Sequence, residues 1–163
     1  MPVSDEFKHT VGKAIGRIPS GVFILTAAHN GEATAMMASW VQQAAFDPPA
    51  VSIAIGKGRA IGEMIAASGK LALSVVPEGD TSLMKRYARG IKPGEDAFAG
   101  VEIITTPGGI PVLAAAIAWI EGDVLSTCEF GGDHDLLIAE ITGGAVLKPG
   151  HAFTHQRGSG FHY

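Results

Sequence analysis

Residues 35–60 read AMMASWVQQAAFDPPAVSIAIGKGRA, in which two apolar runs flank a Pro-Pro turn and a glycine-rich step follows. Residues 47–49 predict that turn, because proline removes backbone donors and restricts the residue before it. The apolar run after the turn, residues 50–55, predicts a strand. The first run contains polar and aromatic side chains of the kind that bind a flat heterocycle, namely Ser39, Trp40, Gln42 and Gln43.

The glycine-rich step is a candidate anion site. Gly56 and Gly58 let the backbone come close to a ligand, and the first amides of the following helix have no partner within that helix. Lys57 and Arg59 add two positive charges at the same place. A phosphate here and a ring at Trp40 indicate a nucleotide-like cofactor. The alternative is a solvated loop that enters a helix.

Length and composition predict one domain, residues 1–163, long enough to fold without a disulfide or a metal. The chain has one cysteine, Cys128, so no internal disulfide can form. This indicates a reducing, cytoplasmic setting, and Cys128 itself is expected to be buried and inert.

A net charge of −4 without a Lys/Arg run argues against nucleic-acid binding. The chain shows neither a long apolar span nor a signal peptide, so no membrane association is expected. Few charges and a high apolar fraction predict a homodimer.

Three helices are predicted from apolar spacing and end signals. The first covers residues 4–16, with Ser4 as its cap and Phe7, Val11, Ala14 and Ile15 on its apolar face. The second covers residues 60–68 and ends at Gly69, and the third begins at Asp80 or Thr81 and ends before Gly90.

The other periodic segments predict strands. Residues 22–28 and 33–40 flank Asn30-Gly31, which is a strong hairpin signal. Further strands are predicted at residues 70–76, 101–105, 117–126 and 136–147, with a turn or short helix at 110–115 and a bend at Gly143-Gly144. Five or more strands in hairpin order with only three helices predict a mainly β, antiparallel barrel decorated by helices.

The segment Gly131–Asp135 is a second candidate for chemistry. His134 lies between two carboxylates, which can fix its tautomer or raise its pKa, so it could donate a proton near a redox centre. The alternative is an ordinary surface turn.

His151 and His155 have no third ligand nearby, so no metal site is predicted. Walker, GxGxxG and Gly-x-Ser-x-Gly motifs are missing from the sequence, which leaves nucleotide hydrolysis, a Rossmann cofactor site and serine catalysis unsupported.

Taken in order, several motifs resemble the flavin reductase-like family, whose fold is an FMN-binding split β-barrel that usually dimerises. They run from about residue 15 to the end of the sequence: GVFILT at 21–26, MASWV at 37–41, AFDPP at 45–49, the step at Lys57, PVL at 111–113, GDH at 132–134 and GSGFHY at 158–163. Three longer strings are similar to flavoredoxin-like proteins and to the flavin reductase module of cyanobacterial flavodiiron (diflavin) proteins: GRIPSGVFILTA, ASWVQQAAFDPP and KPGEDAFAG.

The resemblance also implies residue roles by position. Contacts with the flavin ring are implied for Met37, Ala38, Ser39, Trp40 and Val41, contacts with its polar rim for Gln43 and Ala44, and contacts with the phosphate for Lys57, Gly58, Arg59 and Ala60. His134 falls where the family often places a histidine near the flavin or nicotinamide. Arg157 and the tail are expected to close over the site or the dimer seam. Many members have paired small polar residues where this chain has Ser39-Trp40, so the indole is expected to narrow access to the ring.

The function implied by the resemblance is an NAD(P)H-dependent flavin reductase. In it, electrons pass from the nicotinamide through bound FMN to free flavin, oxygen or a redox protein partner. FAD in place of FMN stays open, as does the choice between NADH and NADPH. The first alternative is a non-enzymatic FMN-binding electron carrier, either flavoredoxin-like or a module of a flavodiiron protein. The second is a barrel that binds no flavin.

Overall fold

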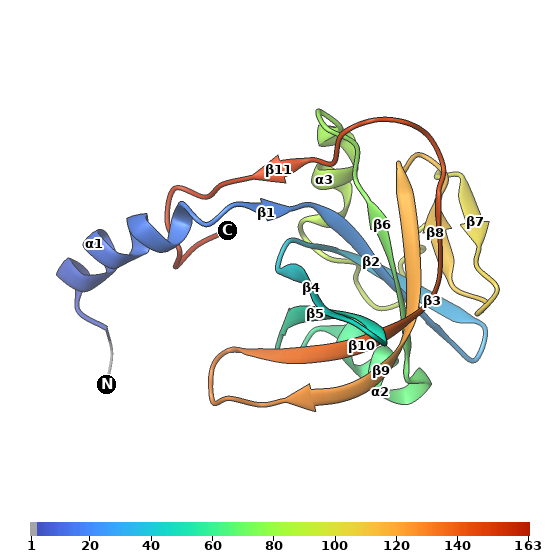
Figure 1. Ribbon diagram of the computed structural model, residues 1–163, viewed down its shortest axis with the longest axis horizontal. Helices are drawn as coiled ribbons and strands as arrows, with labels where there is room; N and C mark the ends of the chain where they lie inside the picture. The colour runs from blue at the N-terminus through green and yellow to red at the C-terminus, as the bar shows by residue number, and fades with distance from the viewer. Residues whose placement is uncertain (1–2) are drawn as a thin grey trace.

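The fold is built around one antiparallel sheet of seven strands in the order β3-β2-β6-β9-β10-β5-β4 (Figure 1). This computed structural model describes residues 3–163. The strands are β2 (Phe23–His29), β3 (Glu32–Ala38), β4 (Val41–Phe46), β5 (Pro49–Gly56), β6 (Lys70–Val75), β9 (Ala118–Cys128) and β10 (His134–Val146). Every neighbouring pair is antiparallel, which confirms the predicted mainly β, antiparallel class.

Helices and short strands complete the fold. They are α1 (Asp5–Gly16), α2 (Ala60–Ser68), α3 (Thr81–Tyr87), β1 (Ser20–Gly21), β7 (Ile103–Thr105), β8 (Pro111–Leu113) and β11 (Thr154–His155). The three predicted helices are confirmed together with their caps: Ser4 accepts from the Phe7 amide, and Gly69 ends α2 at φ 70°. None of the helices within residues 3–163 is long and apolar enough to cross a membrane.

Two apolar clusters lie on the two faces of β2, because successive side chains of a strand point to opposite sides. On one face Leu25 packs with buried residues of β5 and β6 and with Ile61 and Ile65 of α2. On the other face Ile24 packs with Leu83 and Tyr87 of α3. Helices α2 and α3 are therefore fixed against the sheet by their apolar sides, which also fixes the position of their N-terminal ends.

The predicted hairpin at Asn30-Gly31 is confirmed, with both residues at positive φ, 51° and 81°. The predicted bend near Gly143 is confirmed as a register shift between β9 and β10.

The prediction of one strand over residues 33–40 needs a correction. Strand β3 ends at Ala38, the chain turns at Ser39 and Trp40, and β4 follows. The Ala54 amide donates to the Trp40 carbonyl at 3.0 Å and holds this turn against β5.

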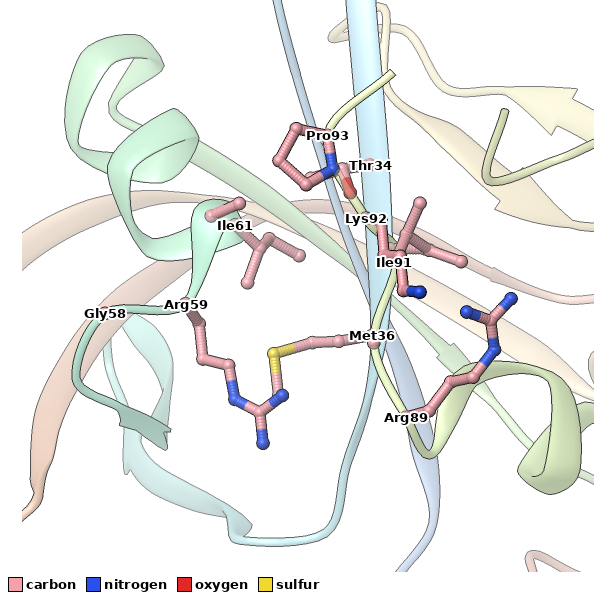
Figure 2. Close-up of a pocket in the computed structure, with 12 residues that line it drawn as sticks. Thr34, Met36, Gly58, Arg59, Ile61, Arg89, Ile91, Lys92 and Pro93 are labelled. Atoms are coloured by element: carbon pink, nitrogen blue, oxygen red, sulfur yellow. The ribbon is translucent and has the colours of Figure 1, made fainter. Parts of the chain in front are cut away.

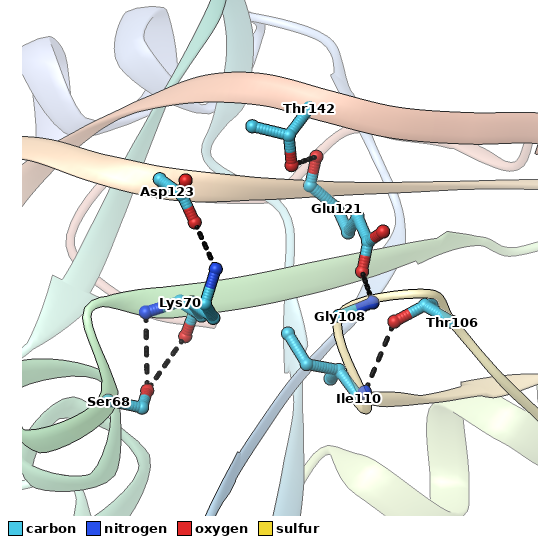
Figure 3. Close-up of polar contacts among 8 residues, drawn as sticks. All are labelled: Ser68, Lys70, Thr106, Gly108, Ile110, Glu121, Asp123 and Thr142. Atoms are coloured by element: carbon cyan, nitrogen blue, oxygen red, sulfur yellow. Dashed lines mark hydrogen bonds and ion pairs between the residues drawn. The ribbon is translucent and has the colours of Figure 1, made fainter.

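Two further predictions were wrong. Residues 110–115 were expected to form a turn or short helix, but they contain strand β8, which pairs with β7. The turn lies before β8, at residues 106–110, where the Ile110 amide donates to Thr106 Oγ1 at 3.1 Å. Figure 3 shows how the buried Glu121 carboxylate ties this turn to β9 by accepting from the Gly108 amide at 3.1 Å. Cys128 is exposed at the end of β9 instead of buried, since the β9–β10 hairpin extends beyond the core there.

Helix α1 and the tail form an arm that stands away from the barrel (Figure 1). Strands β1 and β11 pair at its base. The buried residues of α1 are Gly12 and Gly16, not the predicted apolar face, and Phe7 is 49% exposed. Glycine suits both positions because a Cβ on Gly12 would lie 2.7 Å from the Phe161 ring, and a Cβ on Gly16 would lie 2.6 Å from the Arg157 carbonyl oxygen. The helix therefore packs closely on residues 157–161.

Candidate functional site

Four side chains from separate parts of the chain meet at the turn between β3 and β4. The Trp40 ring centroid lies 4.7 Å from that of His134 and 5.7 Å from that of Tyr163. The Arg157 guanidinium carbon lies 4.8 Å from the Trp40 ring centroid, at the distance of a cation–π contact. The tail thus reaches the turn that the indole occupies, as expected for Arg157.

His134 is held by two hydrogen-bonding partners. Its Nδ1 is 2.8 Å from Asp133 Oδ1, and its Nε2 is 2.6 Å from the Tyr163 hydroxyl. The His134 imidazole lowers the pKa of Asp133 below its usual range, so this carboxylate stays ionised. Burial raises the pKa of Tyr163, and Arg59 and Arg157 partly oppose that rise, so the hydroxyl stays protonated at neutral pH. His134 is a buried residue at the start of β10 and not part of a surface turn.

A small cavity of about 110 Å³ lies beside Trp40. Its walls are apolar and aromatic with one buried hydroxyl, and they come from Met36, Met37, Ala38, Ser39, Trp40, Ala54, Gly56, Arg59, Ala88 and Tyr163. Four of the residues that the resemblance assigned to the ring, Met37 to Trp40, are among them. By itself the cavity is smaller than the ~300–1,000 Å³ usual for a small-molecule pocket.

A second cavity of about 290 Å³ adjoins the first, and Met36 and Arg59 line both. Gly58, Arg59 and Ala60 line it from the start of α2, whereas Arg89 and Lys92 come from the segment after α3. Figure 2 shows these cationic side chains around the same space, with Met36 on the β3 side. The start of α2 adds its own positive end, because Arg59 caps the helix without any side-chain hydrogen bond to the first amides.

Together the two cavities place an aromatic and thioether surface beside a cationic one. The first cavity offers aromatic and thioether surface, and the fixed imidazole of His134 lies next to its Trp40 and Tyr163 walls. The second offers unpaired helix amides and positive side chains, which are the donors that phosphate prefers. The donor set of the described residues therefore fits a flavin mononucleotide.

The other predicted residues lie apart from these cavities. Lys57 turns away to Asp135, with Nζ 3.5 Å from Oδ1, although its backbone remains in the glycine-rich step. Gln43 and Ala44 are exposed on β4, where the register shifts between residues 43 and 45. Val41 begins β4 next to the turn and packs partly against the core.

Sequence reasoning missed Met36, Arg89 and Lys92, and it expected the tail to close over the site or the dimer seam without singling out Tyr163. From the sequence, Arg89 was recognisable only as a positive residue near the end of a predicted helix. Lys92 was recognisable only as part of a predicted surface loop. Tyr163 belonged to a tail without periodicity. These residues lie 30 or more positions from Trp40, apart from Met36, so only the folded chain places them at the site.

A family model described as "Flavin reductase like domain" matches residues 15–160. The chain belongs to the flavin reductase-like family. Diflavin flavoprotein A 1 of Synechocystis sp. is 39% identical over 153 residues, which cover 93% of this chain and 26% of that protein. The chain spans about a quarter of the length of the curated relatives it matches.

Solved structures of the family share the fold. The NADH:FAD oxidoreductase SgcE6 of Streptomyces globisporus superposes with a TM-score of 0.85 and 24% identity, over 97% of this chain and 94% of that chain. The flavin reductase PheA2 superposes with a TM-score of 0.79 and 25% identity, over 96% and 95% of the two chains. A second structure of SgcE6 is described as a complex with NAD and FAD fragments.

Proposed function

We propose that this domain is an NAD(P)H-dependent flavin reductase that uses bound FMN to pass electrons from nicotinamide to free flavin, oxygen or a protein acceptor. The observation that carries the proposal is the adjacency of the Trp40 cavity to the cationic cavity at the start of α2. Membership of the family and structural neighbours described as flavin reductases support it.

The ring of FMN is assigned to the smaller cavity. Met37, Ala38, Ser39 and Trp40 would contact its face and edge, with Val41, Gln43 and Ala44 at the outer rim along β4. Ser39 is a buried polar residue that lines this cavity, so a polar ring atom could hydrogen-bond to its hydroxyl. When bound, FMN supplies the two-electron chemistry of its ring, which no side chain of this protein offers.

The phosphate of FMN is assigned to the second cavity. Gly58 has φ 76°, which turns the backbone so that Arg59 can cap α2 and leave the first amides open. Gly58, Arg59 and Ala60 would hold the phosphate, and Lys92 would add a charge-assisted contact. Arg89 is paired with Glu95 and would contribute at longer range. Lys57 would contribute at longer range, because its side chain is paired with Asp135.

His134 is assigned the role of proton holder beside the ring. Asp133 accepts from Nδ1, which leaves Nε2 to the hydroxyl of Tyr163, a residue that lines the cavity. An imidazole fixed in this way can hold a proton at Nε2 and release it near a ring that gains negative charge. The protein then needs no nucleophile of its own.

Anaerobic stopped-flow mixing tests the reductase. Protein loaded with FMN is mixed with NADH or with NADPH, and bleaching of the flavin and loss of nicotinamide absorbance are followed together. We expect reduction by at least one donor, with turnover when free FMN is added. Bound FMN that stays oxidised with both donors would contradict the proposal.

The second candidate is an electron-transfer module that receives electrons from a partner reductase. The observation that favours it is the chain's match to about a quarter of diflavin flavoproteins, where this domain is joined to further sequence. Trp40 and Tyr163 also line the small cavity with their rings 5.7 Å apart, which limits the space for a nicotinamide beside a bound flavin. The same stopped-flow experiment separates the two functions, because a carrier would be reduced only after a partner reductase is added.

We also propose that the protein is a homodimer. The arm exposes apolar side chains far from the barrel core: Phe7 is 49% and Ile18 62% exposed. Apolar patches of this kind on an extended element commonly mark an interface. A second copy of the chain is the proposed occupant.

A further inference from the structure

Tyr163 lines the smaller cavity, and it contacts two groups there at once. Its hydroxyl lies 2.6 Å from His134 Nε2, and its ring lies 5.7 Å from the Trp40 ring. Both groups are among those that the proposed function assigns to a bound ring. A flat ligand that stacks on Trp40 and approaches His134 therefore competes with Tyr163 for the same contacts.

The partners of Tyr163 are fixed, whereas Tyr163 itself is lightly held. His134 is buried and paired along β10 with Gly56 of β5, and the Trp40 carbonyl is bonded to the Ala54 amide. Tyr163 is 73% exposed, and one hydrogen bond with two aromatic contacts holds it. Such contacts contribute little net free energy each, so displacing this side chain costs little.

The tail is anchored just before Tyr163. The Arg157 amide donates to the Gly16 carbonyl at 3.1 Å, and the Gly160 amide donates to the Gly12 carbonyl at 2.6 Å. Phe161 packs against Gly12, where no Cβ would fit. Residues 162 and 163 follow these anchors outside any helix or strand, so Tyr163 can leave the cavity while the tail stays docked on α1.

We propose that Tyr163 is the gate of the flavin pocket, a proposal that rests on the proposed function. With Tyr163 on His134 and Trp40, the cavity of about 110 Å³ is too small for a flavin ring. Withdrawal of Tyr163 exposes the indole face and the His134 Nε2 together. The gate thus sets the rate at which a flat ring reaches Trp40, and it frees His134 only when that ring arrives.

The kinetics of FMN binding test the gate without any turnover. FMN is mixed with the protein, and quenching of flavin fluorescence gives the association rate constant. Tyr163→Phe removes only the hydrogen bond, so we expect association about 2- to 10-fold faster. Tyr163→Ala also removes the ring contacts, so we expect association about 10- to 100-fold faster. His162→Ala, an exposed neighbour in the same tail, should associate at the wild-type rate.

The outcomes separate the gate from the proposed function. Equal association rates for the wild type and both Tyr163 variants would overturn the gate and leave flavin binding intact. Failure of FMN to bind any variant would overturn the proposed function and, with it, the gate. Binding only after Tyr163→Ala would support the gate in its strongest form.

A measurement without flavin tests the closed geometry. Acrylamide quenching of tryptophan fluorescence reports the exposure of Trp40, and Trp119 is 92% buried and adds a constant background. Tyr163→Ala should increase quenching, whereas His162→Ala should not. Unchanged quenching in Tyr163→Ala would show that Tyr163 does not cover the indole in solution and would overturn the gate.

Discussion

Arg59 is the residue on which the proposed phosphate site depends most. It lines both cavities and caps α2, whereas its neighbour Lys57 is paired with Asp135. A charge-assisted hydrogen bond is worth about 1.5–3 kcal/mol, so Arg59→Ala should weaken FMN binding by roughly 10- to 100-fold. Isothermal titration with FMN measures the change.

Lys57→Ala is the matched control for Arg59→Ala, because it removes the same charge two residues away. Its side chain points to Asp135, so we expect FMN affinity to fall less than about fivefold, the size of a screened charge effect. A larger loss for Lys57→Ala than for Arg59→Ala would reverse the assignment of the phosphate ligand. Riboflavin, which lacks the phosphate, should bind Lys57→Ala and the wild type equally. It should lose less affinity than FMN in Arg59→Ala, because Arg59 also lines the smaller cavity.

Residue identity alone predicted part of this site. Trp40, Ser39 and Arg59 were recognisable because they sit beside local signals, the Pro-Pro turn and a glycine-rich step before a helix. Arg89 and Tyr163 carried no local signal, because their role arises only when α3 and the tail fold back to residues near Trp40. The direction of the Lys57 side chain depended on Asp135 of β10, a pairing that sequence spacing cannot reveal.

At the scale of elements, helix α3 depends on the carboxylate of Asp80. This group accepts from the Ser82 and Leu83 amides at 3.1 and 3.2 Å, and the bond with the Ser82 hydroxyl lowers its pKa below the usual 3.8. A group with a lowered folded pKa stabilises the protein above its unfolded pKa and loses that effect as the pH falls through the folded value.

We therefore expect Asp80→Ala to lower the free energy of unfolding by about 0.5–2 kcal/mol at pH 7, the usual cost of a lost N-cap. The difference from wild type should shrink below the normal Asp pKa of about 4, where the carboxyl of the unfolded chain begins to protonate, and should keep shrinking down to the lowered folded pKa. Urea unfolding at several pH values measures this, with Asp80→Asn as a cap that does not titrate. A difference that stays constant down to the acid limit would contradict the prediction.

The packing of α1 on the tail gives a second prediction for an element. A Cβ on Gly16 would lie 2.6 Å from the Arg157 carbonyl oxygen, so Gly16→Ala should push the tail off the helix and expose the Arg157 amide. Faster hydrogen exchange at residues 157–161 measures the displacement. Unchanged exchange in Gly16→Ala would contradict the packing.

Gly62 in α2 is the contrasting glycine, because a Cβ added there would have no atom within 4 Å. Gly62→Ala should therefore stabilise the protein by about 0.5–1 kcal/mol.

Most elements were predictable because their signals are local. Asn30-Gly31 sets a hairpin, and Gly69 ends a helix in the left-handed conformation that it tolerates best. The turn at Ser39 and Trp40 was missed because it depends on a bond from Ala54, far along the chain. Strand β8 was missed because three residues are too few for a period, and pairing with β7 decides its state.

At the scale of the whole molecule, the arm links the chain's two ends to its proposed flavin site. Helix α1 holds the tail, and the tail places Arg157 and Tyr163 at Trp40. An arm that stands away from the barrel has little of its own core, since Gly12 and Gly16 are the buried residues of α1. Its position therefore depends on whatever covers its apolar side chains.

A second copy of the chain is the proposed cover, and the oligomeric state tests it. A stable interface commonly buries about 1,200–2,000 Å² in total, and the loss of a central aromatic costs enough to dissociate many dimers. We expect light scattering to give twice the mass of one chain for the wild type and a single chain for Phe7→Asp at the same concentration. Phe46→Asp is the control, because Phe46 is 90% exposed at the end of β4, outside the arm. A dimer that persists in Phe7→Asp would place the interface away from α1, and Tyr163 would then be positioned by the single chain alone.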